Sequence, residues 1–350
     1  MSALHATYRL VWVVMLGLIR GRLGGNGGSQ IREENRPAGE SIGPVGCLKW
    51  GPEEGVAGGE GRGMVVDRET NYVCVSDLLS GRFPSVFEAL GRILSEHGIG
   101  FGVASGTRDI WLRDFTPVQV DCDGSFVLFR YFPDYLRQRN QDLITDAREL
   151  ISDFPGVRSC EYSDIVLDGG NVVRHHDKAI VTDKIYRENP GNGRAELRGR
   201  LRKLLRVETL IVVPKEPFDP FGHADGMASW LDDRTMLIND YSAASASFRR
   251  RLDQSLGRHQ FDLIELPYDP QPGGRDGIPT AAGNWMNFLR VRDVLIVPTF
   301  GMKGDERVLG ILRDVHPGYA VEAVECCKLA REGGLLHCVT WQASWNEESR

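Results

Sequence analysis

The sequence has no excess of basic charge and no apolar run long enough to cross a membrane. Its 350 residues carry 42 Lys and Arg against 48 Asp and Glu, a formal charge of −6. Nucleic-acid-binding proteins show the opposite imbalance, so we expect no nucleic-acid partner. The apolar run from Leu10 to Ile19 would span about 15 Å as a helix, half of a bilayer core, so we expect no membrane partner.

Closely spaced cysteine pairs are also lacking. The chain has 7 Cys, with no CxxC pattern and no zinc-like spacing. A disulfide scaffold is improbable at this length, which favours a cytoplasmic location and argues against a bound metal or other cofactor. Secretion through the signal-like segment after Arg9 is the alternative, although no small-x-small cleavage site follows it. We expect the adjacent Cys326 and Cys327 to be core residues.

Glycine is distributed unevenly. Residues 1–63 hold 15 of the 41 Gly. The Gly24 to Gly28 segment is followed by no helical pattern, so it does not predict a phosphate-binding loop. The composition instead predicts that residues 1–63 form a disordered extension or result from a wrongly assigned start, and that 64–350 form one catalytic domain.

Strand-like and helix-like runs alternate beyond Met64, which predicts an α/β fold. Among the expected helices are an apolar stripe from Phe87 to Leu94 that ends at His97-Gly98, residues 143–151, and the basic stretch 194–205, whose charged face we expect to be solvated. The last expected strand covers residues 335–340.

Four polar clusters lie on or beside predicted strand ends, far apart in the sequence. Polar residues in otherwise apolar surroundings are costly unless they are paired or functional, so these clusters are the candidates for chemistry. They are Asp109-Ile110-Trp111-Leu112-Arg113-Asp114, Leu167-Asp168-Gly169-Gly170-Asn171, Phe221-Gly222-His223-Ala224-Asp225-Gly226 and Gly333-Gly334-Leu335-Leu336-His337-Cys338-Val339-Thr340.

The residue types in these clusters suit one reaction. Cys338 is a candidate nucleophile if a cation lowers the pKa of its thiol. His223 could move protons, and Asp225 would share its face of a predicted strand. Together Asp114, Asp168 and Asp225 would make a pocket suited to a guanidinium group, which would itself stabilise a thiolate. Structural roles remain open for each cluster: Asp225 capping a turn, Asp168 in an Asx turn, and Cys338 in the core.

The order of the motifs resembles that of agmatine deiminases and the bacterial, Porphyromonas-type peptidylarginine deiminases, over Val66 to Gln342. The resemblance implies the five-bladed α/β-propeller (pentein) fold of guanidine-modifying enzymes, built from ββαβ-type modules. It also implies a hydrolase that converts an agmatine- or arginine-like guanidine to a ureido product and ammonia, without a cofactor. The shared motifs are Trp111-x-Arg113-Asp114, Asp168-Gly169-Gly170-Asn171, Gly222-His223-x-Asp225 and Gly333-Gly334-x-x-His337-Cys338-x-Thr340.

The resemblance also implies roles for individual residues. Cys338 would be the nucleophile, His223 the general acid and base, and Asp114 and Asp225 the groups that bind the guanidinium. Asp168 would pair with the histidine, where agmatine deiminases usually carry the longer Glu.

Two further residues would line the site: Trp111 would wall the pocket and Asn287 would lie beside it. The chain departs from agmatine deiminases at Phe115-Thr116-Pro117, where they usually read x-Gly-Pro, and at Trp341, where they tend to carry Gln. These departures concern the end of the substrate that does not react, so which guanidine is preferred stays open.

Other functions remain to be distinguished. An amidinotransferase would share the covalent intermediate, and a non-catalytic binding module would keep only the fold. A zinc hydrolase would use His223, Asp225 and either His337 or Cys338, although the His-Glu-x-x-His pattern is absent. His175-His176-Asp177 is more simply a polar turn between two strands. The sequence does not fix whether the chain forms a homo-oligomer.

Overall fold

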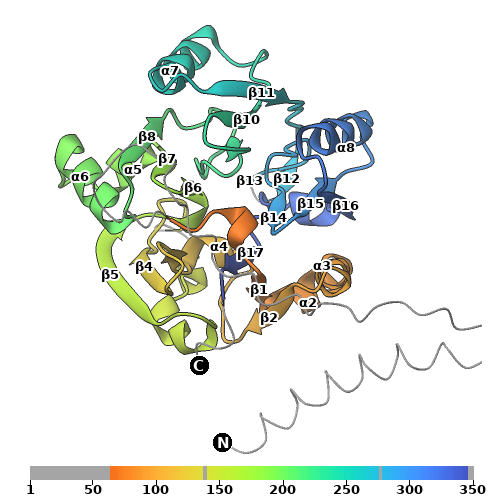
Figure 1. Ribbon diagram of the computed structural model, residues 1–350, viewed down its shortest axis with the longest axis horizontal. Coiled ribbons are helices and arrows are strands. Elements are labelled where there is room, and N and C mark those ends of the chain that lie inside the picture. The colour runs from red at the N-terminus through yellow and green to blue at the C-terminus, as the bar shows by residue number, and fades with distance from the viewer. Residues whose placement is uncertain (1–63, 137–139, 276–277, 346–350) are drawn as a thin grey trace, which may run out of the picture. The chain divides into compact units, whose positions relative to one another are not determined.

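The computed structural model describes residues 64–345, except 137–139 and 276–277 (Figure 1). The Leu10 to Ile19 run and the Gly24 to Gly28 segment therefore lie outside the described residues. Five three-stranded sheets and one two-stranded ribbon form this part of the chain. The sheets are β17-β1-β2 (Thr340–Ala343, Tyr72–Ser76, Gly100–Ala104); β3-β4-β5 (Val118–Gln119, Ser125–Arg130, Ser159–Val166); β6-β7-β8 (Val173–His175, Lys178–Thr182, Thr209–Val213); β9-β10-β11 (Ala228–Trp230, Thr235–Asn239, Asp262–Leu266); and β14-β15-β16 (Leu289–Val291, Val294–Thr299, Ala320–Glu325).

All five sheets share one pairing pattern. The middle strand pairs antiparallel with one neighbour and parallel with the other. In four sheets the antiparallel neighbour precedes the middle strand in the chain. In the first it is the C-terminal strand β17, which pairs with β1. The expected α/β fold is therefore confirmed, whereas closure of the sheets into a propeller stays a prediction.

A parallel pair needs a crossover, and helices supply it in four of the sheets. Figure 1 shows each crossover helix beside the sheet that it connects. The helices are α2 (Asp77–Arg82) and α3 (Pro84–Glu96), α5 (Lys184–Glu188) and α6 (Arg194–Leu204), α7 (Ala246–Gly257), and α8 (Lys303–Val315). The shorter elements are η1 (Asp67–Glu69), α4 (Leu112–Phe115), η5 (Gly169–Asn171), the ribbon β12 (Gly274–Arg275) and β13 (Ile278–Pro279), and α9 (Cys327–Ala330).

The expected helix over residues 143–151 is wrong. Three short 3-10 helices stand there: η2 (Gln141–Leu143), η3 (Ala147–Glu149) and η4 (Ile151–Asp153). Asp146 has an extended backbone, and its carboxylate caps the Arg148 N–H, so it starts a new turn and interrupts any longer helix. The expected helix along the stripe from Phe87 to Leu94 is confirmed as α3, and the one over 194–205 as α6.

The expected strand over residues 335–340 is also wrong. Residues 336–339 form turns, in which the Val339 N–H donates to the Leu335 carbonyl, and β17 begins only at Thr340. By contrast, His176 and Asp177 do form the expected turn, linking β6 and β7.

None of the six cysteines in the described part of the chain forms a disulfide; Cys326 is buried and Cys327 half-buried. Among the described residues, no helix is long and apolar enough to span a membrane.

Trp341 of β17 anchors the C-terminal strand in the core. Its ring packs against Phe126 and Phe154, and its indole N–H donates to the Pro117 carbonyl oxygen at 2.8 Å. We expect Trp341→Ala to lower the free energy of unfolding by about 3–5 kcal/mol, because it empties a large buried volume. Urea unfolding measures this, with Tyr162→Ala, whose residue is 56% exposed, as the matched control expected to change little. Equal effects of the two substitutions would contradict the prediction.

Candidate active site

The five residues expected to carry the chemistry lie together, although four separate segments supply them. Asp114 lies on α4, Asp168 two residues after β5, and His223 and Asp225 in the loop before β9. Cys338 lies two residues before β17. The expectation that His223 and Asp225 lie on one strand is wrong, because both precede β9 and the Asp225 N–H bonds the Gly170 carbonyl.

His223 lies between two carboxylates. Its Nε2 is 2.9 Å from Asp168 Oδ2, and its Nδ1 is 3.6 Å from Asp114 Oδ1. The single methylene of Asp168 therefore reaches the histidine. Burial would lower the pKa of His223, but the charge of Asp114 and the hydrogen bond to Asp168 outweigh it and raise that pKa to about 9. The ring is thus an imidazolium at neutral pH.

A buried lysine that the sequence analysis missed completes this group. Lys184 of α5 donates to Asp168 Oδ2 at 2.5 Å and lies 3.3 Å from Glu188 Oε1, and all three side chains are fully buried. Burial would raise the pKa of Asp168, but Lys184 and His223 hold it below its usual range. Lys184 also opposes the rise in the pKa of His223.

The cysteine thiol faces an acidic environment. Cys338 Sγ lies 3.9 Å from Asp225 Oδ2 and donates to Asn287 Oδ1 at 3.3 Å, so the expected position of Asn287 beside the site is observed. Burial, and then the charges of Asp225 and Asp114, raise the pKa of the thiol well above its usual value. The free site therefore holds a thiol, and a cation must enter before a thiolate is stable.

The two carboxylates that face the cysteine side differ in charge state. Burial and the neighbouring Asp168 and Asp225 raise the pKa of Asp114 well above the usual range for a carboxyl group. Burial would raise the pKa of Asp225 too, but His337 Nδ1 donates to its Oδ2 at 2.7 Å and its pKa is lowered. Asp225 is therefore the stronger acid of the two, and the His223 imidazolium, which lowers the pKa of Asp114, favours the ionised form of Asp114.

Gly170 is a second residue that the sequence analysis did not single out. A Cβ at this position would lie 2.7 Å from Asp114 Oδ1, 2.9 Å from His223 Nδ1 and 3.2 Å from Asp225 Oδ2. The Gly170 N–H donates to Asp114 Oδ1 at 3.1 Å. These three functional groups therefore converge on space that only glycine leaves open.

Aromatic rings border the same site. Trp111 packs so closely on Gly334 that a Cβ there would lie 2.4 Å from the indole ring, in agreement with the expected wall. The Tyr135 and Phe221 rings meet edge to face at 4.9 Å, and Tyr135 also lies 6.4 Å from the His223 ring. No motif pointed to Tyr135, because its place comes from packing alone.

Arg113 supports the cysteine turn from behind. Its Nη2 donates to Gln342 Oε1 at 3.1 Å, and its backbone N–H donates to the Cys338 carbonyl oxygen. Burial, and then the neighbouring Arg174, lower the pKa of this guanidinium to about 10, so it stays charged at neutral pH.

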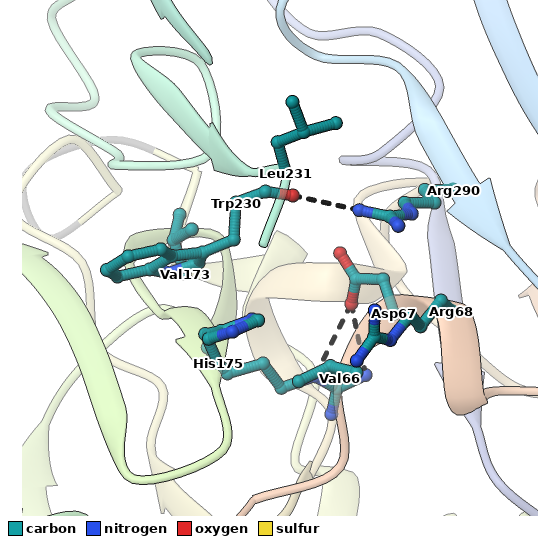
Figure 2. Close-up of a pocket in the computed structure, with 9 residues that line it drawn as sticks. Val66, Asp67, Arg68, Val173, His175, Trp230, Leu231 and Arg290 are labelled. Carbon is teal, nitrogen blue, oxygen red and sulfur yellow. Dashed lines mark hydrogen bonds and ion pairs between the residues drawn. The ribbon is translucent and has the colours of Figure 1, made fainter. Parts of the chain in front are cut away.

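A cavity of different chemistry lies apart from these residues (Figure 2). It is lined by groups that include Asp67, Arg174, His175, Trp230 and Arg290, and by none of the expected catalytic residues. Arg174 is ion-paired with Asp67, and Arg290 Nη1 donates to the Trp230 carbonyl oxygen at 2.8 Å. Its arginines are therefore partly compensated within the protein.

Comparison with known proteins identifies the family. The model of the Porphyromonas-type peptidyl-arginine deiminases matches residues 69–343. The chain belongs to this family. It is 25% identical over 285 residues to an agmatine deiminase of Pseudomonas aeruginosa, covering 67% of this chain and 74% of that protein.

Solved structures of the same family share the fold. An agmatine deiminase of Enterococcus faecalis superposes with a TM-score of 0.64 at 19% identity, covering 82% of this chain and 96% of the other. The agmatine deiminase of C. jejuni gives a TM-score of 0.64 at 17% identity, with 80% and 95% covered. The expected family is thus confirmed, whereas the roles of individual residues stay predictions.

The charges around His223 predict how its ring titrates. In a histidine NMR titration we expect a midpoint near 9 for the unchanged chain. Asp114→Asn removes a negative charge beside the imidazolium and should lower the midpoint. Lys184→Met removes an opposing positive charge and should raise it.

Asp253→Asn and Lys203→Met, both at exposed positions, are the matched controls and should leave the midpoint unchanged. Shifts in the same direction for Asp114→Asn and Lys184→Met would refute the electrostatic account.

Proposed function

We propose that this protein is a hydrolytic deiminase that converts the guanidinium group of a small substrate to a ureido product and ammonia. The observation that carries the proposal is the convergence of Asp114, His223 and Asp225 on the space above Gly170, with the Cys338 thiol beside it. A planar guanidinium fits between two carboxylates, each of which can accept a pair of N–H groups.

Substrate binding prepares the nucleophile. The guanidinium brings positive charge next to Asp114 and Asp225, the two groups that raise the pKa of the Cys338 thiol. It thereby favours loss of the thiol proton to solvent, which leaves the thiolate, and holds the carbon close to Sγ. The thiolate attacks that carbon, and a C–S bond forms.

His223 then acts as an acid. The tetrahedral adduct expels ammonia as the C–N bond breaks, and the imidazolium supplies the proton to the departing nitrogen. A thiouronium bound to Cys338 remains. Asp168, held by Lys184, keeps the ring oriented through its hydrogen bond to Nε2.

The same histidine, now neutral, takes a proton from water, which attacks the thiouronium carbon. The C–S bond breaks, the ureido product leaves and the thiol is regenerated, so no redox partner is consumed. This sequence of steps gives a role to each of the three groups that converge above Gly170, namely Asp114, His223 and Asp225, and to Cys338 and Asp168 beside them.

The relatives narrow the substrate class to agmatine-like or arginine-like guanidines. We also infer that the five sheets are the blades of a five-bladed propeller, that residues 64–350 form a single catalytic domain, and that the enzyme works in the cytoplasm. The shared pairing pattern of the sheets and the family match over residues 69–343 support the first two of these inferences.

Cys338→Ala tests the function directly. We expect the unchanged protein to release ammonia and a ureido product from agmatine, or from another member of a small guanidine panel, without an added amine acceptor. The variant should lose essentially all turnover and still bind the guanidine in calorimetry, because the carboxylates remain. The Cys-to-Ser variant of the C. jejuni agmatine deiminase, whose structure contains bound substrate, is a precedent for this.

The exposed thiol Cys122 gives the matched control, Cys122→Ala, which should keep full turnover. Release of product only with an amine acceptor would favour an amidinotransferase. Ammonia release by Cys338→Ala would refute the nucleophile assignment.

Gly170→Ala tests the convergence of the three groups. We expect turnover to fall by about 100-fold or more, because the new methyl group would displace Asp114 and His223 from geometry that must be kept within a fraction of an ångström. Gly310→Ala, at a helical position with open space around its Cβ, is the control and should keep full activity. Normal turnover by Gly170→Ala would show that substrate does not use this space.

A further inference from the structure

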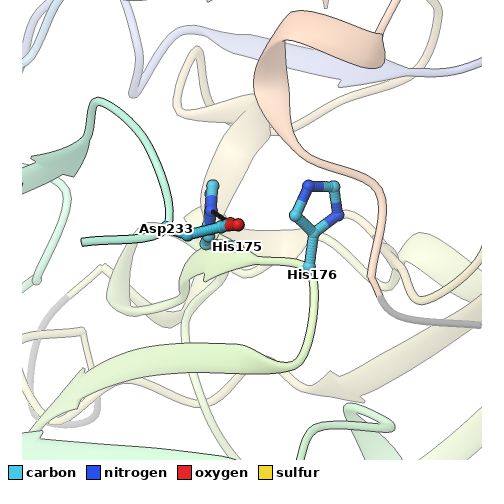
Figure 3. A group of neighbouring side chains, drawn as sticks. All are labelled: His175, His176 and Asp233. Carbon is cyan, nitrogen blue, oxygen red and sulfur yellow. Dashed lines mark hydrogen bonds and ion pairs between the residues drawn. The ribbon is translucent and has the colours of Figure 1, made fainter. Parts of the chain in front are cut away.

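Two adjacent histidines and a distant aspartate form a second polar cluster. His175 ends β6, His176 begins the turn to β7, and Asp233 lies in the turn between β9 and β10. One ligand atom from each residue lies within 4.8 Å of the others (Figure 3). Two imidazoles and a carboxylate are a set typical of zinc sites.

The backbone turns both rings to the same side. Neighbouring residues of a strand point to opposite faces, so two adjacent histidines would normally diverge. His176 instead has a φ of +42°, a left-handed conformation that costs a residue with a Cβ about 1 kcal/mol or more. Its ring thereby lies 4.8 Å from that of His175, and the Met64 N–H holds the turn by donating to the His176 carbonyl oxygen at 2.7 Å.

The carboxylate of Asp232, and not that of Asp233, stabilises the turn between β9 and β10, so the Asp233 carboxylate is available as a metal ligand. Asp232 accepts the N–H groups of Arg234 and Thr235, both at 2.8 Å. The carboxylate of Asp233 contacts His175 Nε2 at 2.7 Å, and its side chain is 62% exposed. It can therefore move the short distance that a shared metal ion requires.

Packing holds the His175 ring in place, and the charge of the nearby Lys178 is compensated by an ion pair. The His175 ring is 3% exposed and stacks on Trp230 with centroids 5.0 Å apart. The adjacent Lys178 is paired with Asp177 at 2.8 Å. One rigid ligand and two adjustable ones suit a metal that prefers tetrahedral nitrogen and oxygen coordination, whereas Mg²⁺ and Ca²⁺ prefer oxygen ligands alone.

We propose that His175, His176 and Asp233 bind a divalent transition-metal ion of the zinc type, with solvent as the fourth ligand. The ion would join the β6-β7-β8 sheet to the β9-β10-β11 sheet. It would do so at the ends of β6 and β9 that lie away from the proposed catalytic residues, since β6 starts two residues after Asn171 and β9 three residues after Asp225. Its role is structural, independent of the deiminase chemistry.

Zinc titration of the chelator-treated full chain tests this site. We expect calorimetry to show one zinc ion per chain with an affinity that His176→Gln and Asp233→Asn each weaken by about tenfold or more. Zinc should raise the melting temperature of the unchanged protein by several degrees and leave that of both variants almost unchanged. Cobalt should give the visible absorption of a tetrahedral nitrogen and oxygen site.

His259→Gln and Asp253→Asn, at exposed positions on and just after α7, are the matched controls and should retain zinc. Zinc bound at exposed thiols would remain in all four variants, so the comparison distinguishes it from zinc bound by His175, His176 and Asp233. An unchanged zinc affinity in either His176→Gln or Asp233→Asn would overturn the proposal, as would the absence of zinc binding by the unchanged chain.

Discussion

The structure depends on the repulsion among three carboxylates held in one buried site. Two like charges 4 Å apart repel by about 4 kcal/mol even in a moderately polarisable environment, so they persist only beside compensating cations. The cations His223 and Lys184 compensate Asp168, whereas Asp225 accepts a hydrogen bond from His337, whose own pKa is lowered by burial. Each of these cations comes from a different segment of the chain than the carboxylate that it neutralises. The charge balance of the site therefore holds the surrounding loops in one arrangement.

Positively charged side chains neutralise the carboxylate on the Asp168 side of the site more fully than the carboxylates on the Cys338 side. Asp168 is an ordinary buried anion with two cationic partners. On the Cys338 side, the pKa of the thiol and that of Asp114 are both raised, first by burial and then by the neighbouring carboxylates. A guanidinium is the ligand that corrects both at once, because it neutralises the carboxylates and stabilises the thiolate. The substrate thus supplies the charge that makes its own nucleophile, and an empty site leaves Cys338 unreactive.

Sequence reasoning predicted the α/β class and the residues of the cluster, because clustered polar types at strand ends are visible without coordinates. It failed where local pattern and tertiary contact disagree. Residues 335–340 have strand-like composition but bend to present Cys338, and Asp146 interrupts an otherwise helical apolar spacing. Lys184 was invisible because an isolated lysine in a short helix normally faces solvent. Gly170 belongs to the Asp168-Gly169-Gly170-Asn171 motif, but the sequence does not reveal that atoms of Asp114 and His223 lie close enough to exclude a side chain there.

The two ends of β6 illustrate why residues that are neighbours only in space are not predicted from the sequence. The catalytic loops and the His175 turn are separated only by the three residues of β6, yet they meet different partners because each end contacts a different turn of the neighbouring sheet. At one end Gly170 meets Asp225, and at the other His175 meets Asp233. Hydrogen bonds therefore join the chain on either side of β6 to the segments on either side of β9: the Asp225 N–H donates to the Gly170 carbonyl oxygen, and His175 Nε2 contacts the Asp233 carboxylate. Both contacts lie far apart in the sequence, so no local pattern could have indicated either of them.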